Sequence, residues 1–143
     1  MPDVKDSSLN ANQLVVDAKS QIKEIDVDAL RKALSSNSTA KHDYLLIDVR
    51  EPYELMVGKI PDAVNIPRGR LEFDIWQQAP LKLLDLDDPE NKVVASQLPI
   101  YLYCRSGGRS ALAAKSLQDI GFENVHSVAG GFSAWQASKF ATD

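Results

Sequence analysis

Short apolar runs separate the amphipathic stretches of this chain. Two of them, Tyr44–Ile47 and Pro99–Tyr103, show no polar alternation, which is typical of strands covered on both faces of a sheet. Three shorter runs complete the set of segments that we expect to be extended. The predicted strands cover residues 22–25, 44–47, 63–66, 99–103 and 125–128.

Apolar residues recur at helical spacing in several segments between these runs. Residues that begin or end helices lie at their borders: Asp26 can cap one helix, Pro52 can occupy the first turn of another, and Gly121 can end a third. We expect Ala113, Leu117 and Ile120 to be the buried stripe of the longest helix. The predicted helices cover residues 10–20, 27–34, 52–57 and 110–120 and a short stretch around Trp135, with helical pieces at 71–76 and 81–84.

Strands and helices therefore alternate along the chain, which predicts an α/β fold with a mostly parallel central sheet flanked by helices. Ser35–Thr39 and the acidic run Asp85–Glu90 are expected to be surface loops. A length of 143 residues corresponds to one domain, with the first helix as an N-terminal extension.

Composition excludes several classes of protein. Hydrophobic residues make up 44% of the chain and charged residues 25%, which are ordinary globular values. The net charge of −4 argues against a dedicated nucleic-acid binder. No apolar run approaches the length of a membrane span, and the first six residues do not resemble a signal peptide. We expect a soluble, cytoplasmic protein with no nucleic-acid or membrane partner.

The chain has a single cysteine, Cys104, which excludes a disulfide within the chain and a cysteine-rich zinc site. The two histidines, His42 and His126, do not have the spacing of metal ligands. We therefore expect no metal and no other cofactor.

Cys104 follows the strongest predicted strand and opens a polar, glycine-rich segment that leads into a helix. We call residues 104–109 the Cys104 loop. Ligands bind at this edge of an α/β sheet, and the free N–H groups and dipole of a helix N-terminus lower a thiol pKa. Gly107 and Gly108 allow backbone angles that direct N–H groups to one point, while Arg105 and Arg109 add positive charge. A lone cysteine is most often a buried small hydrophobe, but this context favours a reactive sulfur.

The Cys104 loop, together with the following Ser110, resembles the active-site loop of rhodanese domains, which are sulfurtransferases. Three further segments agree in order and spacing, although Lys59 stands where the family usually has His. They are Leu46–Glu51, Gly58–Pro67 and Gly130–Trp135. The resemblance implies a rhodanese-like three-layer fold over residues 22–138, with an N-terminal extension at 1–21 and a tail at 139–143.

The resemblance also implies a mechanism. The Cys104 thiolate would take the outer sulfur of thiosulfate or a similar small anionic donor, forming a persulfide. Cyanide in vitro, or a thiol in the cell, would then accept the sulfur; a thioredoxin-like or sulfur-relay protein could carry that thiol. The donor-binding residues would be Arg105, Ser106, Gly107, Gly108 and Arg109.

Three alternatives remain open. Phosphatases and arsenate reductases of related fold share the Cys-loop-helix arrangement, but they place one more residue between Cys and Arg than the four found here. Position 110, where that spacing would place arginine, is Ser110. A non-catalytic binding module would usually lack the cysteine. A peroxide-sensing thiol would need an exposed Cys104.

Other notable residues have simpler explanations. We expect Asp48 and Arg50 to form a structural ion pair or turn hydrogen bond. Arg68 and Arg70 could add charge near the Cys104 loop, although a solvated surface explains them equally well. Trp76 and Trp135 are expected to pack in the core or at its rim.

Overall fold

Five parallel strands form one sheet at the centre of the computed structural model, which describes residues 10–36 and 43–143. Their spatial order is β1-β5-β4-β2-β3, so the two strands with the most apolar sequences, β2 and β4, lie side by side in the interior. The bounds are β1 Lys23–Ile25, β2 Leu45–Asp48, β3 Val64–Asn65, β4 Ile100–Tyr103 and β5 Val125–Val128. All five predicted strands are present.

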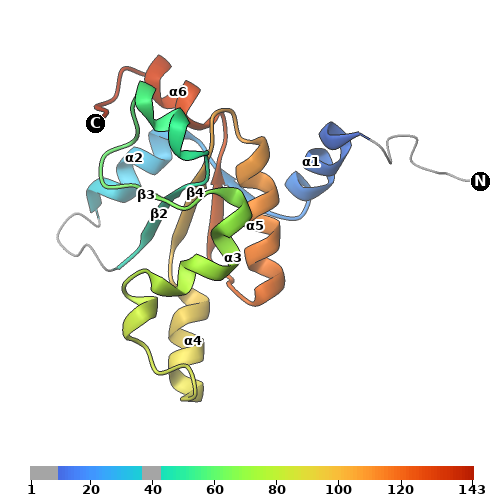
Figure 1. Ribbon diagram of the computed structural model, residues 1–143, viewed down its shortest axis with the longest axis vertical. Helices are drawn as coiled ribbons and strands as arrows, with labels where there is room; N and C mark the ends of the chain where they lie inside the picture. Colours follow the sequence, from blue (N-terminus) through green and yellow to red (C-terminus); the bar gives the residue numbers. More distant parts are fainter. Residues whose placement is uncertain (1–9, 37–42) are drawn as a thin grey trace, which may run out of the picture.

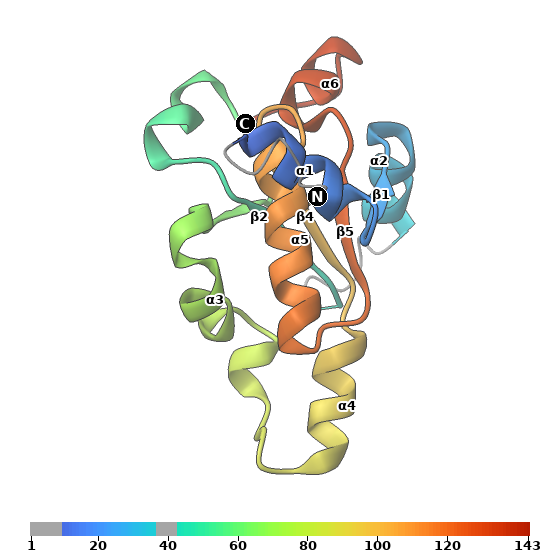
Figure 2. The same ribbon diagram turned by 90° about the vertical axis from the view of Figure 1, so that its right-hand side faces the viewer.

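Helices cover both faces of this sheet, as Figures 1 and 2 show. One face packs against α5, α3 and α4, and the other against α2 and α6. The bounds are α1 Ala11–Lys19, α2 Val27–Ser36, α3 Leu71–Asp74, α4 Pro89–Gln97, α5 Gly108–Ile120 and α6 Gly131–Ala137; short 3-10 helices are η1 Pro52–Val57, η2 Arg68–Arg70, η3 Ile75–Gln77 and η4 Leu81–Leu83. The fold is therefore the expected three-layer α/β arrangement.

Strand alternation decides which side chains face which layer. In β4, Ile100 and Leu102 lie with Cys104 in the cluster under α5, whereas Tyr101 and Tyr103 lie in the cluster under α2 and α6. The cysteine that follows β4 therefore points toward the start of α5.

The N-terminal helix packs on the outside of α5 rather than on the sheet (Figure 1). Because α5 is its main neighbour, it buries a narrow stripe: Ala18 is buried, whereas Leu14 is 58% exposed. No helix in the described segments has both the length and the apolar character needed to cross a bilayer.

Three expectations about element limits and one about burial were wrong. The acidic run 85–90 is not entirely loop, because α4 begins at Pro89, where the Asp88 side chain accepts the Glu90 N–H at 2.9 Å. Ser35 and Ser36 belong to α2, and residues 37–39 lie outside the described part. Helix α5 begins at Gly108, two residues before the predicted start at Ser110. Ile120, at its end, is 43% exposed and does not belong to the buried stripe.

The last five residues return to the domain surface. The Trp135 indole N–H donates to the Ala141 carbonyl at 2.8 Å, and Phe140 packs edge-on against the same ring. Lys59 and Asp143 exchange backbone hydrogen bonds of 2.9 and 3.3 Å. The segment predicted to be a tail therefore lies against residues 58–59.

Candidate functional site

Cys104 lies at the carboxyl edge of the sheet, directly after β4 and four residues before α5 begins. The chain turns at Gly107, whose φ of +108° is readily adopted only by glycine. This turn brings the Gly107 N–H to 3.1 Å from the Cys104 Sγ. The side chain is only 1% exposed, so the sulfur lies at the bottom of its loop rather than on the surface.

The sulfur is surrounded by hydrogen-bond donors. Burial by itself raises the pKa of the Cys104 thiol, but backbone N–H groups of Ser110, Gly107 and Ser106 and the Ser110 hydroxyl outweigh it. The Sγ–Oγ distance to Ser110 is 3.6 Å. The pKa of Cys104 is consequently lowered, which favours the thiolate, the nucleophilic form of the residue.

The start of α6 holds the Cys104 loop in this orientation. The Phe132 N–H donates to the Cys104 carbonyl at 2.8 Å, and the Ser133 N–H donates to the Arg105 carbonyl at 3.0 Å. These two carbonyls therefore point toward α6, away from the sulfur. Gly131 makes the approach possible, because its φ is +53° and a Cβ there would overlap the Cys104 carbonyl.

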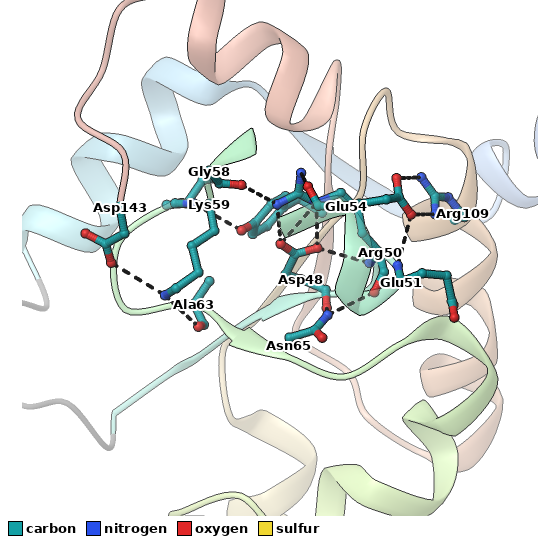
Figure 3. A network of polar contacts seen from close by, with 12 residues as sticks. Asp48, Arg50, Glu51, Glu54, Gly58, Lys59, Ala63, Asn65, Arg109 and Asp143 are labelled. Atoms are coloured by element: carbon teal, nitrogen blue, oxygen red, sulfur yellow. Dashed lines mark hydrogen bonds and ion pairs between the residues drawn. The ribbon is translucent and has the colours of Figure 1, made fainter. Parts of the chain in front are cut away.

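Arg109 does not point freely into the site. Its guanidinium donates two hydrogen bonds to the Glu54 carboxylate, of 2.6 and 3.0 Å (Figure 3). The Arg109 hydrogen bonds lower the pKa of Glu54 to about 2, and Glu54 in turn raises the pKa of Arg109. The positive charge expected from Arg109 is thus balanced by a residue of η1.

A buried ion pair holds η1 in place. Arg50 is 1% exposed and its Nη2 lies 2.7 Å from the Asp48 Oδ2. The same nitrogen donates to the Gly58 carbonyl at 2.9 Å (Figure 3). The guanidinium also lies 4.5 Å from the centre of the Phe132 ring. The structural ion pair expected for Asp48 and Arg50 is confirmed, and it fixes the end of the segment that carries Glu54.

The residues predicted to bind the donor differ in their exposure and in their position relative to the sulfur. Arg105 and Ser106 are exposed beside the sulfur, while Gly107 forms the turn. Gly108 does not adopt a special backbone angle; it opens α5, and Val15 of α1 lies beside it. Arg68 and Arg70 form ion pairs with Glu72 and Asp74, each at 2.8 Å. Arg105 is therefore the exposed cation within the loop.

Sequence reasoning missed three residues that shape this site: Glu54, Ser110 and Ser127. Ser110 closes the motif that carries the family resemblance, so its position after the loop was a usable signal. Ser127 lies in β5, where its hydroxyl is 2.8 Å from that of Ser110. The exposed thiol that a peroxide sensor would need is absent, because Cys104 is buried. Within the described ranges, no group of three or more His, Cys, Asp or Glu residues is placed to hold a metal ion.

Most of the chain matches the model of one protein family. Residues 26–138 match the family model described as Rhodanese-like domain. A sulfurtransferase of Allochromatium vinosum is 31% identical over 114 residues, a match that covers 80% of this chain and 88% of that protein. The adenylyltransferase and sulfurtransferase UBA4 of Meyerozyma guilliermondii is 36% identical over 99 residues, which are 69% of this chain but only 22% of that protein.

Solved structures share the whole architecture. A Rhodopseudomonas palustris protein of unknown function, described as a possible tyrosine phosphatase, has a TM-score of 0.72 and 30% identity, covering 100% of this chain and 99% of that one. The polysulfide-sulfur transferase of Wolinella succinogenes, a homodimer, also has a TM-score of 0.72, with 26% identity over 96% of this chain and 90% of that one. Both matches include the region of the N-terminal helix.

Proposed function

The chain belongs to the rhodanese-like domain family, and from that premise we propose that it is a sulfurtransferase that carries a sulfane sulfur on Cys104. The observation that carries the proposal is the set of donors around the Cys104 sulfur. Three backbone N–H groups and one hydroxyl converge on one buried atom, and together they lower its pKa. Such a cradle stabilises a thiolate and equally a persulfide, whose negative charge lies one atom further out.

The proposed reaction has two steps. The Cys104 thiolate attacks the outer sulfur of thiosulfate; the S–S bond of the donor breaks, and its electron pair leaves with sulfite. Cys104 then carries a persulfide. A nucleophile attacks the outer sulfur of this persulfide and the Cys104 thiolate is regenerated, so that cyanide becomes thiocyanate and a thiol becomes a persulfide.

Each loop residue has a place in this scheme. Ser106 and Gly107 supply backbone N–H groups to the sulfur, and the exposed Arg105 side chain attracts the dianionic donor. Gly108 begins α5, where Val15 of α1 lies beside it. Arg109, being paired with Glu54, contributes positive charge only in part.

A phosphate ester is the less suitable substrate. A transferring phosphoryl group needs donors spread over three equatorial oxygens and a guanidinium fork aimed at them. Here the Arg109 fork is occupied by Glu54, and four residues separate Cys104 from Arg109. The short loop favours a single sulfur atom over a phosphoryl group.

The acceptor and the setting are part of the proposal. A physiological thiol must reach a sulfur that is only 1% exposed, which favours a small thiol or a protein that presents its cysteine on a protruding loop, as in a thioredoxin-like or sulfur-relay protein. Such chemistry suits a reducing compartment such as the cytoplasm.

Intact mass spectrometry tests the scheme. Mixing with thiosulfate should add one sulfur to the wild type and none to Cys104→Ser, and cyanide should remove it. If the folded wild type gains no sulfur from thiosulfate, from polysulfide or from a persulfide donor, the proposal is wrong. Turnover of a phosphate ester that depends on Cys104 would instead support the phosphatase alternative.

A further inference from the structure

Four polar or charged side chains are buried to 1% exposure or less among the described residues: Asp48, Arg50, Ser110 and Ser127. The first two form the ion pair that supports η1. The other two form a second pair, with their hydroxyl oxygens 2.8 Å apart. Ser110 also lies against the Cys104 sulfur, so the second pair connects the catalytic position to β5.

Strand register explains how these hydroxyls meet. In the parallel pairing of β4 with β5, Ser127 stands beside Leu102, two residues before Cys104. Residues in register share a face, so Ser127 joins the layer that packs under α5. Ser110 lies in the first turn of α5 and is fully buried, as is Ser127. The sheet and the helix thus each present one hydroxyl to the space behind the sulfur.

Packing does not account for a serine at position 127. Its neighbours in this layer are Leu102 and Val125, and a hydroxyl buried in such surroundings costs free energy unless it is hydrogen bonded. Within the described residues, its side-chain hydrogen bond is to Ser110. An apolar residue of similar size would fill the position without that cost, so packing alone does not explain the hydroxyl.

The direction of the hydrogen bonds depends on the state of the sulfur. When Cys104 is a thiol, its S–H can donate to Ser110, which then donates to Ser127 and leaves the Ser127 hydrogen without a described acceptor. When Cys104 is a thiolate, Ser127 donates to Ser110 and Ser110 donates to the sulfur. Every hydroxyl hydrogen then has an acceptor, so the chain is better satisfied in the thiolate form.

We propose that Ser127 is a positioning residue for the thiolate: it orients the Ser110 hydroxyl so that its hydrogen points at the Cys104 sulfur. The proposal deepens, and rests on, the function proposed above. Charged groups around the sulfur come from other elements and are left unchanged by a substitution in β5: Arg105 in the loop, Arg109 in α5 and Glu54 in η1. The neighbouring His126 stacks on Tyr101, on the opposite face of the sheet.

The test measures the ionisation of Cys104 directly. Because Cys104 is the only cysteine, the ultraviolet absorbance of the thiolate and the rate of alkylation by iodoacetamide both report its titration. Ser127→Ala should move the midpoint upward by about half to one pH unit, as expected for a net hydrogen-bond contribution of about 1 kcal/mol. Below both midpoints, alkylation should slow about three- to tenfold.

Matched variants separate orientation from packing. Ser127→Thr and Ser127→Val introduce side chains of nearly the same shape, but only Ser127→Thr keeps a hydroxyl. We therefore expect Ser127→Thr to retain the wild-type midpoint of the Cys104 titration and Ser127→Val to raise it. Ser116→Ala removes another α5 hydroxyl, which donates to Glu72 at 2.6 Å, and should leave the midpoint unchanged. In a Ser110→Ala background, Ser127→Ala should have no further effect, because its influence passes through Ser110.

An unchanged midpoint in folded Ser127→Ala overturns the proposal. So does an equal rise in the Thr and Val variants, which would mean that packing alone is responsible. Neither measurement requires sulfur transfer. A wild type that titrates as expected but accepts no sulfur would therefore count against the proposed function and not against the role of Ser127.

Discussion

Glu54 and Arg109 form an ion pair with two hydrogen bonds near Cys104, although they are 55 residues apart in the sequence. The Glu54 side chain is 15% exposed and that of Arg109 38%, so water screens the pair only in part. Its effect is to reduce the positive charge near the sulfur. Of the two arginines in the loop, Arg109 is paired with Glu54, whereas Arg105 is exposed and has no ion-pair partner among the described residues.

Removing the Glu54 charge should strengthen binding of an anionic donor. We expect Glu54→Gln to lower the KM for thiosulfate about two- to fivefold at low ionic strength, the factor that corresponds to a screened interaction of up to about 1 kcal/mol. The effect should diminish as salt is added, because screening shortens the range of the released charge. Steady-state kinetics at two ionic strengths, with cyanide as acceptor, measures it.

The control for this variant is Asp119→Asn, which removes one carboxylate near the other end of α5, where Asp119 pairs with Lys115 at 2.7 Å. It should leave the KM unchanged. A KM that rises in Glu54→Gln would show that the ion pair holds Arg109 in a productive position rather than withdrawing it.

Arg105→Ala should have the opposite effect. The side chain is exposed beside the sulfur, so its loss should raise the KM for thiosulfate about three- to fivefold at low salt and less at high salt. Arg70→Ala, which removes another exposed cation, one that is paired with Asp74, should not change the KM. A KM that is insensitive to Arg105→Ala would mean that the backbone donors alone bind the anion.

The strands were predictable because buried parallel strands consist of unbroken apolar runs, and β2 and β4 are the clearest examples. Helix α4 could not be predicted in this way, because its apolar residues do not form a buried face. Val93 and Val94 are 62% and 55% exposed, and Ala95 is the only buried residue of this helix. Its one usable signal was the Asp88-Pro89 start. Ile120 was misplaced because the helical periodicity continues to the last residue of α5, where the side chain is 43% exposed.

Cys104 and its loop were predictable because the signal is local: a strand, a turn and a helix start within ten residues of chain. Glu54 and Ser127 could not be found in the same way. Each meets its partner only through the sheet, across 55 and 17 residues, and neither belongs to a pattern that singles it out in the sequence. The charge balance around Cys104, unlike the position of Cys104 itself, depends on tertiary contacts.

The glycine at position 131 should be among the least replaceable residues of the fold. Gly131→Ala would place a Cβ against the Cys104 carbonyl, at a backbone angle that is already unfavourable for alanine, so we expect a loss of about 2–4 kcal/mol in unfolding free energy and a marked loss of activity. Gly69→Ala meets no atom within 4 Å and should be neutral or slightly stabilising. Urea denaturation compares the two, and equal stabilities would contradict the assigned contact.

The Glu54–Arg109 pair also predicts a particular acid dependence of stability. The Arg109 hydrogen bonds lower the pKa of Glu54 from 4.5 to about 2 in the folded protein. For a carboxylate with a lowered folded pKa, the stabilisation is complete above the unfolded pKa and disappears as the pH falls through the folded one. The difference in unfolding free energy between wild type and Glu54→Gln should therefore be constant above about pH 5.5 and should shrink progressively toward pH 2.

Urea denaturation of both proteins between pH 3 and pH 7 measures this difference. A difference that does not change over this range would mean that Glu54 titrates alike in the folded and unfolded chains, and that the ion pair contributes nothing to stability.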